Sequence, residues 1–272
     1  MDHRPIGVFD SGLGGLTCVK ELRRLMPHEN IVYFGDTGRV PYGSRSAETI
    51  IKYARQDAAF LNTFHPKAIV IACGTVSATA LEVLRQEYPD IPILGVVDPT
   101  AQAAAAVSRN GKIGLLGTEA TIKSGAYERA VTALRPGAQV FPKACPLFVP
   151  LVENRRCSVY DPVTRLVVQE YLDPLKREGV DTLVLGCTHY PLLRDAIADF
   201  MGDGVTLIDA GATCARRVVK LLAANESLTG GGRGRSRYFV SDTPDGFAAA
   251  ATLFLGEDLS PSAVEQIDIT AY

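Results

Sequence analysis

The sequence lacks the features that mark a secreted, membrane or nucleic-acid-binding protein. No apolar run approaches the ~18 residues that a membrane-spanning helix needs. The first residues, MDHRP, are not followed by an apolar signal segment. The formal net charge is −2, so no basic excess points to nucleic acid or to an anionic membrane. We therefore expect a cytoplasmic protein with neither nucleic acid nor a membrane as partner.

The cysteines lack the spacing of a disulfide framework or a zinc site. No CxxC pair occurs, and widely spread cysteines without a signal peptide are expected to be free thiols. Cys187 and His189 are close enough to share a metal ion, but no nearby second pair completes a tetrahedral set. We therefore predict free thiols and no metal site. The six cysteines are Cys18, Cys73, Cys145, Cys157, Cys187 and Cys214.

Nucleotide-binding motifs are missing as well. The stretch DSGLGG (10–15) lacks the GxGxxG spacing, and no P-loop is present. A tight strand-to-helix turn, with Asp10 or Ser11 capping the helix, is an equally good interpretation of this stretch. An anionic ligand could still be held by backbone N–H groups and hydroxyls at helix N-termini.

The sequence does contain a regular alternation of apolar strands and amphipathic helices. Continuous apolar strands alternating with helices indicate parallel sheets that are covered on both faces. A chain of 272 residues is long enough for two modest α/β domains. The first predicted strands are 6–10, 31–35, 68–73 and 91–97, and the first predicted helices are 16–26 and 47–64.

The same pattern begins again in the second part of the chain. KIGLLGTEAT (112–121) resembles PIGVFDSGLG, TLVLGCTHY resembles IVIACGTVS, and VTLIDAG resembles PILGVVDPT. Asp98 follows Cys73 by 25 positions, and Asp209 follows Cys187 by 22. We predict an α/β fold of two pseudo-symmetric parallel-sheet domains with the active site in the cleft between them. The ordinary rhythm of any α/β chain is the alternative explanation.

The end of the chain adds a helix from about Ala212, a strand in SRYFVSD and a last helix in DGFAAAATLFL. These elements follow the completed second half, so we expect them to pack back on the first. The predicted first domain is therefore discontinuous, comprising residues 1–97 and 212–272, and the second comprises 98–211.

Reactive side chains follow the predicted strands. In open parallel sheets, ligands bind beyond the carboxyl ends of the strands. The segments that end there are Asp10-Ser11-Gly12, Cys73-Gly74-Thr75, Gly117-Thr118 and Cys187-Thr188-His189. If the two sheets face each other, Cys73 and Cys187 lie on opposite walls of one cleft.

Each thiol needs a reason to be reactive, because free cysteine is often simply buried. A helix N-terminus or a nearby histidine can lower a thiol pKa toward neutrality. Both cysteines precede predicted helices, His189 lies two residues from Cys187, and Asp10 could accept a proton near Cys73. Two thiols at matched repeat positions, each with a threonine nearby, favour a catalytic pair over two inert residues.

Four motifs together resemble the glutamate racemases of the aspartate/glutamate racemase superfamily: VFDSGLGGLTCVKEL, YFGDTGRVPYGSRS, ACGTVSA and LGCTHYPLL. They extend from residue 8 to residue 193. The resemblance implies cofactor-independent interconversion of L- and D-glutamate for peptidoglycan synthesis, and a homodimer. It implies one cysteine as the base that removes the α-proton and the other as the acid that protonates the opposite face.

The resemblance also implies roles for individual residues. Cys73 and Cys187 would be the acid–base pair, with Asp10 and His189 assisting and with Asp36 and Glu153 as supporting acids. The implied substrate contacts are Asp10, Ser11, Tyr42, Gly43, Gly74, Thr75, Thr118, Thr188 and His189. One position departs from the family pattern: Gly74 stands where asparagine is usual, so a substrate contact there must come from the backbone or water, or be lost.

Other functions remain open from the sequence. A related racemase could act on aspartate or another small acid. A non-catalytic glutamate-binding or regulatory protein could keep the same scaffold, since fold does not fix function. A thiol hydrolase using Cys187, His189 and an acid is a third possibility, but it leaves Cys73 unexplained.

Overall fold

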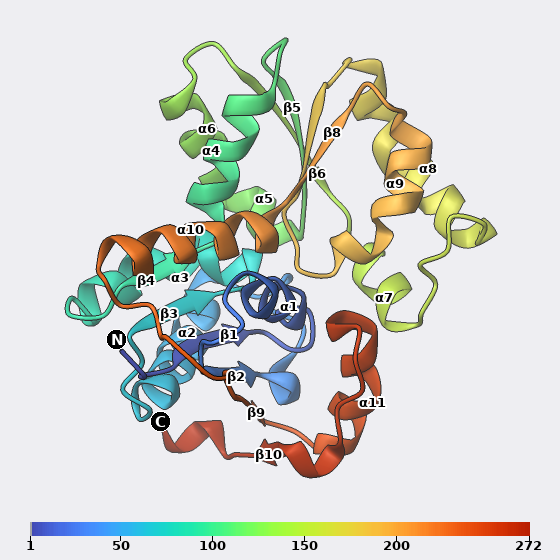
Figure 1. Cartoon of the computed structure of the whole chain (residues 1–272). Helices are drawn as coiled ribbons and strands as arrows, with labels where there is room; N and C mark the ends of the chain where they lie inside the picture. The colour runs from blue at the N-terminus through green and yellow to red at the C-terminus, as the bar shows by residue number, and fades with distance from the viewer. Residues whose placement is uncertain (1) are drawn as a thin grey trace.

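Buried runs of β-branched and aromatic residues form two separate parallel sheets (Figure 1). The computed structural model describes residues 2–272. The first sheet has the strand order β10-β9-β2-β1-β3-β4, and the second has the order β6-β5-β7-β8. The strands are β1 (Ile6–Asp10), β2 (Ile31–Gly35), β3 (Ala68–Ile71), β4 (Ile93–Gly95), β5 (Lys112–Gly117), β6 (Gln139–Ala144), β7 (Thr182–Leu185), β8 (Thr206–Asp209), β9 (Ser236–Val240) and β10 (Val264–Gln266).

Helices connect successive strands, as parallel pairing requires. Side-chain caps start four of them, because Ser46, Thr118, Asp161 and Asp209 accept hydrogen bonds from the first turns of their helices. The helices are α1 (Leu16–Leu25), α2 (Ala47–Asn62), α3 (Gly74–Glu87), α4 (Val97–Val107), α5 (Glu119–Ser124), α6 (Ala126–Leu134), α7 (Phe148–Glu153), α8 (Pro162–Arg177), α9 (Arg194–Met201), α10 (Ala210–Ala224) and α11 (Pro244–Leu255). Short 3₁₀ helices are η1 (Thr37–Arg39), η2 (Tyr190–Leu193), η3 (Pro261–Ala263) and η4 (Ile269–Ala271).

The two sheets repeat one strand order. In the first, β2-β1-β3-β4 lie side by side, and in the second β6-β5-β7-β8 occupy the corresponding places. This correspondence confirms two pseudo-symmetric α/β domains and is more than the ordinary rhythm of an α/β chain. It also places the residues after β3 and after β7 at equivalent positions in their domains.

The end of the chain adds two strands to the first sheet. β9 pairs with β2, with Tyr33 opposite Tyr238, and β10 pairs with β9. The helix that leads there, α10, packs against α1 of the first sheet's domain and α4 of the second's, and Figure 1 shows it in orange between the sheets. The exact limits expected for the two domains remain a prediction.

Some sequence expectations about the elements need correction. β3 ends at Ile71 and β4 covers only three residues, so both are shorter than the apolar runs that predicted them. The sequence pattern did not predict β10. Within the described part of the chain, no helix combines the length and apolarity that crossing a bilayer demands.

Candidate active site

The carboxyl ends of β1, β3, β5 and β7 open onto one cavity of about 380 Å³ between the two domains. Cys73 comes from the first domain and Cys187 from the second, and both line this cavity. It therefore brings together most of the residues that the sequence singled out. Those lining it are Ser11, Tyr42, Gly43, Cys73, Gly74, Thr75, Thr118, Glu153, Cys187, Thr188 and His189.

Cys73 lies directly after β3, at the N-cap position of α3. The thiol is 5% exposed and lies 3.6 Å from the Ser11 hydroxyl oxygen. Burial and the charge of Asp10 raise the pKa of Cys73 to about 12, although the backbone N–H of Val76 opposes them. The expectation that a helix N-terminus brings this pKa toward neutrality is therefore wrong, because burial and the carboxylate outweigh the helix. Cys73 is a protonated thiol at neutral pH.

Asp10 ends β1 and is buried beneath the cavity rather than among the described residues that line it. One carboxyl oxygen accepts a hydrogen bond of 3.1 Å from the Gly12 N–H, and the other has no partner in the described structure. Burial raises the pKa of Asp10, against the opposing effect of His189. The capping interpretation is wrong, because α1 begins only at Leu16 with Gly15 at its N-cap.

Cys187 follows β7 in a turn that leads to η2. The expected helix after it, α9, begins only at Arg194, so Cys187 does not lie at a helix N-terminus as predicted. Its charged neighbour is instead His189, which immediately precedes η2. The electrostatic partner of this thiol is thus a side chain rather than a helix end.

His189 is held between the second thiol and an acid from another helix. Its Nε2 lies 3.1 Å from an oxygen of Glu153, the last residue of α7. The ring of Phe254 from α11 packs edge-on against the imidazole at 5.1 Å. Burial lowers the pKa of His189, but hydrogen bonds to Cys187 and Glu153 outweigh it and raise the pKa to about 10. His189 is therefore an imidazolium at neutral pH.

Two glycines allow loops of the first domain to lie against the loop that carries Cys187. A Cβ on Gly74 would lie 2.1 Å from the carbonyl oxygen of Gly186, which immediately precedes Cys187. A Cβ on Gly14 would lie 2.1 Å from the Thr188 hydroxyl oxygen. Real Cβ atoms do not approach other atoms so closely. The absence of a side chain at Gly74 therefore sets how near the two thiol loops come, and its absence at Gly14 sets how near the loop after β1 comes to the Cys187 loop. Gly74 thus has a packing role that the sequence did not reveal.

Hydroxyl groups bridge the two domains at the cavity. The Thr75 and Thr118 side-chain oxygens lie 2.8 Å apart, and the Thr17 hydroxyl donates to the Thr188 carbonyl at 3.1 Å. Thr118 also caps α5, accepting from the Thr121 N–H. Hydroxyls and helix N-termini of this kind suit the carboxylate of a small acid. Within residues 2–272, no group of three His, Cys, Asp or Glu side chains is placed to hold a metal ion.

The loop after β2 forms another wall of the cavity. Tyr42 and Gly43 line it, and the Gly43 carbonyl accepts a 2.9 Å hydrogen bond from the Ala120 N–H of the second domain. Asp36 is fully buried behind this wall and accepts a hydrogen bond from the Tyr42 hydroxyl. Asp36 is therefore placed to support the wall, and it is not among the described residues that line the cavity.

The cavity also includes residues that the sequence analysis did not select. Cys145, from the segment after β6, is a third thiol in the lining, and Phe254 covers His189 from the far end of the chain. The matched repeat positions could not identify Cys145, since the first half has no equivalent cysteine after β2. Other unselected lining residues are Gly12, Leu13, Val40, Pro41, Ser44, Glu119, Pro146, Val149, Pro150 and Tyr190.

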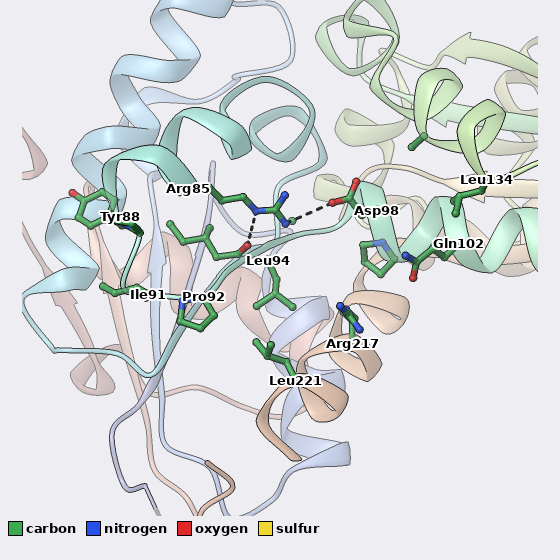
Figure 2. Close-up of a pocket in the computed structure, with 15 residues that line it drawn as sticks. Arg85, Tyr88, Ile91, Pro92, Leu94, Asp98, Gln102, Leu134, Arg217 and Leu221 are labelled. Atoms are coloured by element: carbon green, nitrogen blue, oxygen red, sulfur yellow. Dashed lines mark hydrogen bonds and ion pairs between the residues drawn. The ribbon is translucent and has the colours of Figure 1, made fainter. Parts of the chain in front are cut away.

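A second and larger cavity, of about 530 Å³, lies between α3, β4, α4, α6 and α10 (Figure 2). Figure 2 shows Arg85 reaching Asp98, at 3.6 Å. Arg85 also donates to the Ile93 carbonyl, at 3.1 Å. Among the described residues that line this cavity there is no cysteine or histidine. The cavity with the two thiols is therefore the candidate active site.

A fold of two facing α/β domains with one thiol from each in a shared cavity defines an enzyme of the amino-acid racemase class. Comparisons with known proteins agree. The Asp/Glu/Hydantoin racemase family matches residues 16–218. The glutamate racemase of Geobacter metallireducens is 46% identical over 272 residues, covering 100% of this chain and 99% of that protein.

Solved structures give the same assignment. A glutamate racemase isoform from Bacillus anthracis matches with a TM-score of 0.92 at 39% identity, covering 98% of each chain. The glutamate racemase from Francisella tularensis, solved in complex with D-glutamate, matches with a TM-score of 0.92 at 36% identity, covering 100% of each. The chain belongs to the Asp/Glu/Hydantoin racemase family and is an enzyme of its glutamate racemase group.

Proposed function

We propose that the protein interconverts L- and D-glutamate by transferring protons between the substrate Cα and two thiols, without a cofactor. The observation that carries this proposal is that Cys73 and Cys187, one from each domain, line one cavity of about 380 Å³. The structural relative solved with D-glutamate supports glutamate as the substrate. Inversion at carbon requires an acid and a base on opposite faces, and thiols from two facing domains meet that requirement.

The surroundings of the thiols suggest their roles. We assign Cys187 as the base, because it lies beside the cationic His189. We assign Cys73 as the acid, because its raised pKa keeps it protonated. Cys187 takes the α-proton while the C–H electron pair stays on Cα, and Cys73 gives its proton to the opposite face and becomes a thiolate. The reverse reaction exchanges the two roles.

The α-proton is weakly acidic, so the transient carbanion needs electrostatic stabilisation. We propose that the hydroxyls of Ser11, Thr75, Thr118 and Thr188 and the N–H groups at the start of α3 bind the substrate carboxylates. Fixed donors in a closed site are worth more than the same donors in water. Tyr42 and the backbone of Gly43 and Gly74 would complete the substrate contacts, with Asp10 and Asp36 supporting them from beneath.

The test is ¹H NMR of L- and D-glutamate in D₂O with the purified enzyme and no added cofactor. We expect loss of the α-proton signal from both enantiomers together with interconversion. Exchange of aspartate in place of glutamate would favour the racemase of another small acid. Glutamate binding without exchange would favour a non-catalytic binding protein, and an acyl-enzyme detected by mass spectrometry would favour a thiol hydrolase.

We further propose that the D-glutamate serves peptidoglycan synthesis, that the enzyme acts in the cytoplasm, and that it forms a homodimer. These proposals are supported by membership in the glutamate racemase group. Loss of growth that added D-glutamate restores would test the first. Fractionation of cells and sedimentation of the purified protein would test the other two.

A further inference from the structure

Asp57 is a fully buried carboxyl group that the proposed mechanism does not use. It lies on α2, outside the motifs that carried the family resemblance. A buried carboxyl without a strong reason to be there is costly, so its partners indicate what it does.

Asp57 belongs to a buried polar cluster behind the cavity wall. Arg39 donates to Asp36 at 2.6 Å and to Asp57 at 3.1 Å. Arg39 also donates to the side chain of Gln56 at 2.5 Å and lies over the ring of Tyr53 at 4.1 Å. Its guanidinium is thereby fixed between α2 and the loop after β2.

Tyr42 connects this cluster to the cavity. Its hydroxyl has one proton, which it donates to Asp36, and its oxygen lies 3.4 Å from an oxygen of Asp57. A protonated Asp57 can donate to that oxygen, whereas an ionised Asp57 has no proton to offer it and can only accept, as it does from Arg39. The arrangement therefore fits a neutral Asp57.

The charges around Asp57 lead to the same conclusion. It faces Asp36, Tyr42 and more distantly Asp10, with Arg39 as the cation. Burial raises the pKa of Asp57 well above its ordinary value, Asp36 raises it further, and Arg39 offsets this only in part.

The loop that this cluster holds, residues 36–46, reaches across the cavity to the second domain. The Gly43 carbonyl accepts from the Ala120 N–H at 2.9 Å, and a Cβ on Gly43 would lie 2.8 Å from the Thr118 Cβ. The far side of the loop is tied down as well, because Ser241 donates to Asp36 at 2.7 Å. Movement in the cluster would therefore shift the wall that contacts Thr118.

We propose that Asp57, as a neutral carboxylic acid, is a positioning residue that holds the 36–46 loop against the second domain and so sets the affinity for substrate. The inference rests on the proposed racemase function, because substrate affinity is read from the racemisation assay. Asp57 does not touch the cavity, so its effect falls on KM rather than on the proton transfers.

The test compares Asp57→Asn with Asp57→Ala. Asparagine keeps the size and neutrality of the acid, so we expect kcat and KM within about threefold of wild type. Alanine removes both hydrogen-bonding oxygens, and we expect KM to rise about tenfold or more with kcat changed far less. In wild type, KM should rise further at alkaline pH as Asp57 ionises, and Asp57→Asn should reduce that rise.

Asp181→Asn is the matched control. Asp181 is another buried carboxyl, but it lies at the amino end of β7 and accepts hydrogen bonds from Ser108 and from the Arg109 N–H. We expect it to leave KM and its pH dependence unchanged.

Wild-type KM in Asp57→Ala, or an equal defect in Asp57→Asn, would overturn the inference. If the alanine variant does not fold, the pH dependence decides: an Asp57→Asn profile identical to wild type would also overturn it. No turnover in wild type would refute the proposed function itself, whereas normal wild-type turnover with an unaffected Asp57→Ala would refute only the role of Asp57.

Discussion

The two thiol sites occupy equivalent places in their domains but differ in charge. Each cysteine follows the third strand of the repeated order, β3 in one sheet and β7 in the other. Cys73 lies next to the buried Asp10, and its pKa is raised to about 12. Cys187 lies next to His189, whose own pKa is raised to about 10.

This difference shows that the repeated strand order determines where each thiol lies but not which charges surround it. The strand order places a thiol at each carboxyl end, because parallel strands end at the same edge of a sheet. The charge state then depends on neighbours that are not repeated. Glu153 from α7 and Phe254 from α11 contact His189. The neighbours of Cys73 are Asp10 at the end of β1 and Ser11 in the loop that follows.

Removing one thiol at a time is expected to have the largest effect on activity. Cys73→Ser and Cys187→Ser should each reduce racemisation by ~10³-fold or more, because a hydroxyl is a much weaker acid than a thiol and does not lose its proton near neutral pH to become a base. Polarimetry measures the loss, and Cys157→Ser, at a half-buried thiol outside the cavity lining, is the control. Full activity in either variant would exclude the two-thiol mechanism.

The difference in charge between the two thiol sites can be tested by substituting the charged neighbour of each thiol. Asp10→Asn removes a charge that raises the pKa of Cys73, so alkylation of Cys73 by iodoacetamide at pH 9 should become about tenfold faster. His189→Gln removes the cation beside Cys187, so alkylation of Cys187 should become slower. Peptide mass spectrometry reads both thiols in one sample, so each serves as the reference for the other.

Equal changes at both thiols would contradict the assignment of Asp10 to one site and of His189 to the other.

The close contact between the two loops is tested by Gly74→Ala. The added Cβ would lie 2.1 Å from the Gly186 carbonyl oxygen, so the thiol loops must separate. We expect turnover to fall tenfold or more, as about 1 Å of misplacement can cost 10²-fold. Unfolding in urea should show a loss of about 1–3 kcal/mol.

Gly204→Ala is the control for this change, because a Cβ there meets nothing within 4 Å. Equal behaviour of the two alanine variants would show that the contact at Gly74 does not set the distance between the loops.

The last expected effect is on stability against pH rather than on activity. His189 has a folded pKa of about 10 against an ordinary value of 6.5, so it binds its proton more tightly when folded. Its stabilising contribution is fully present below pH 6.5 and is lost as the pH rises through 10. Urea unfolding between these limits should show a falling free energy of unfolding, and His189→Gln should fall less steeply. Parallel curves would contradict the charged state of His189.

Local patterns in the sequence were enough to predict much of the fold. The apolar runs at 6–10 and 31–35 match β1 and β2 residue for residue, because a strand buried on both faces has to be continuously apolar. The repeated motifs predicted the two matching sheets. β10, with only one buried residue, was missed because an edge strand of three residues has no such pattern.

The sequence by itself determined the two sheets and the placement of a thiol, a hydroxyl and a turn after equivalent strands, because these follow from burial pattern and strand direction. Only the tertiary structure decided which charges surround each thiol, that Gly74 meets Gly186, and that Asp57 joins Arg39 behind Tyr42. The physical reason is that burial, charge and close contact depend on distances between segments far apart in the chain, and no local pattern encodes those distances.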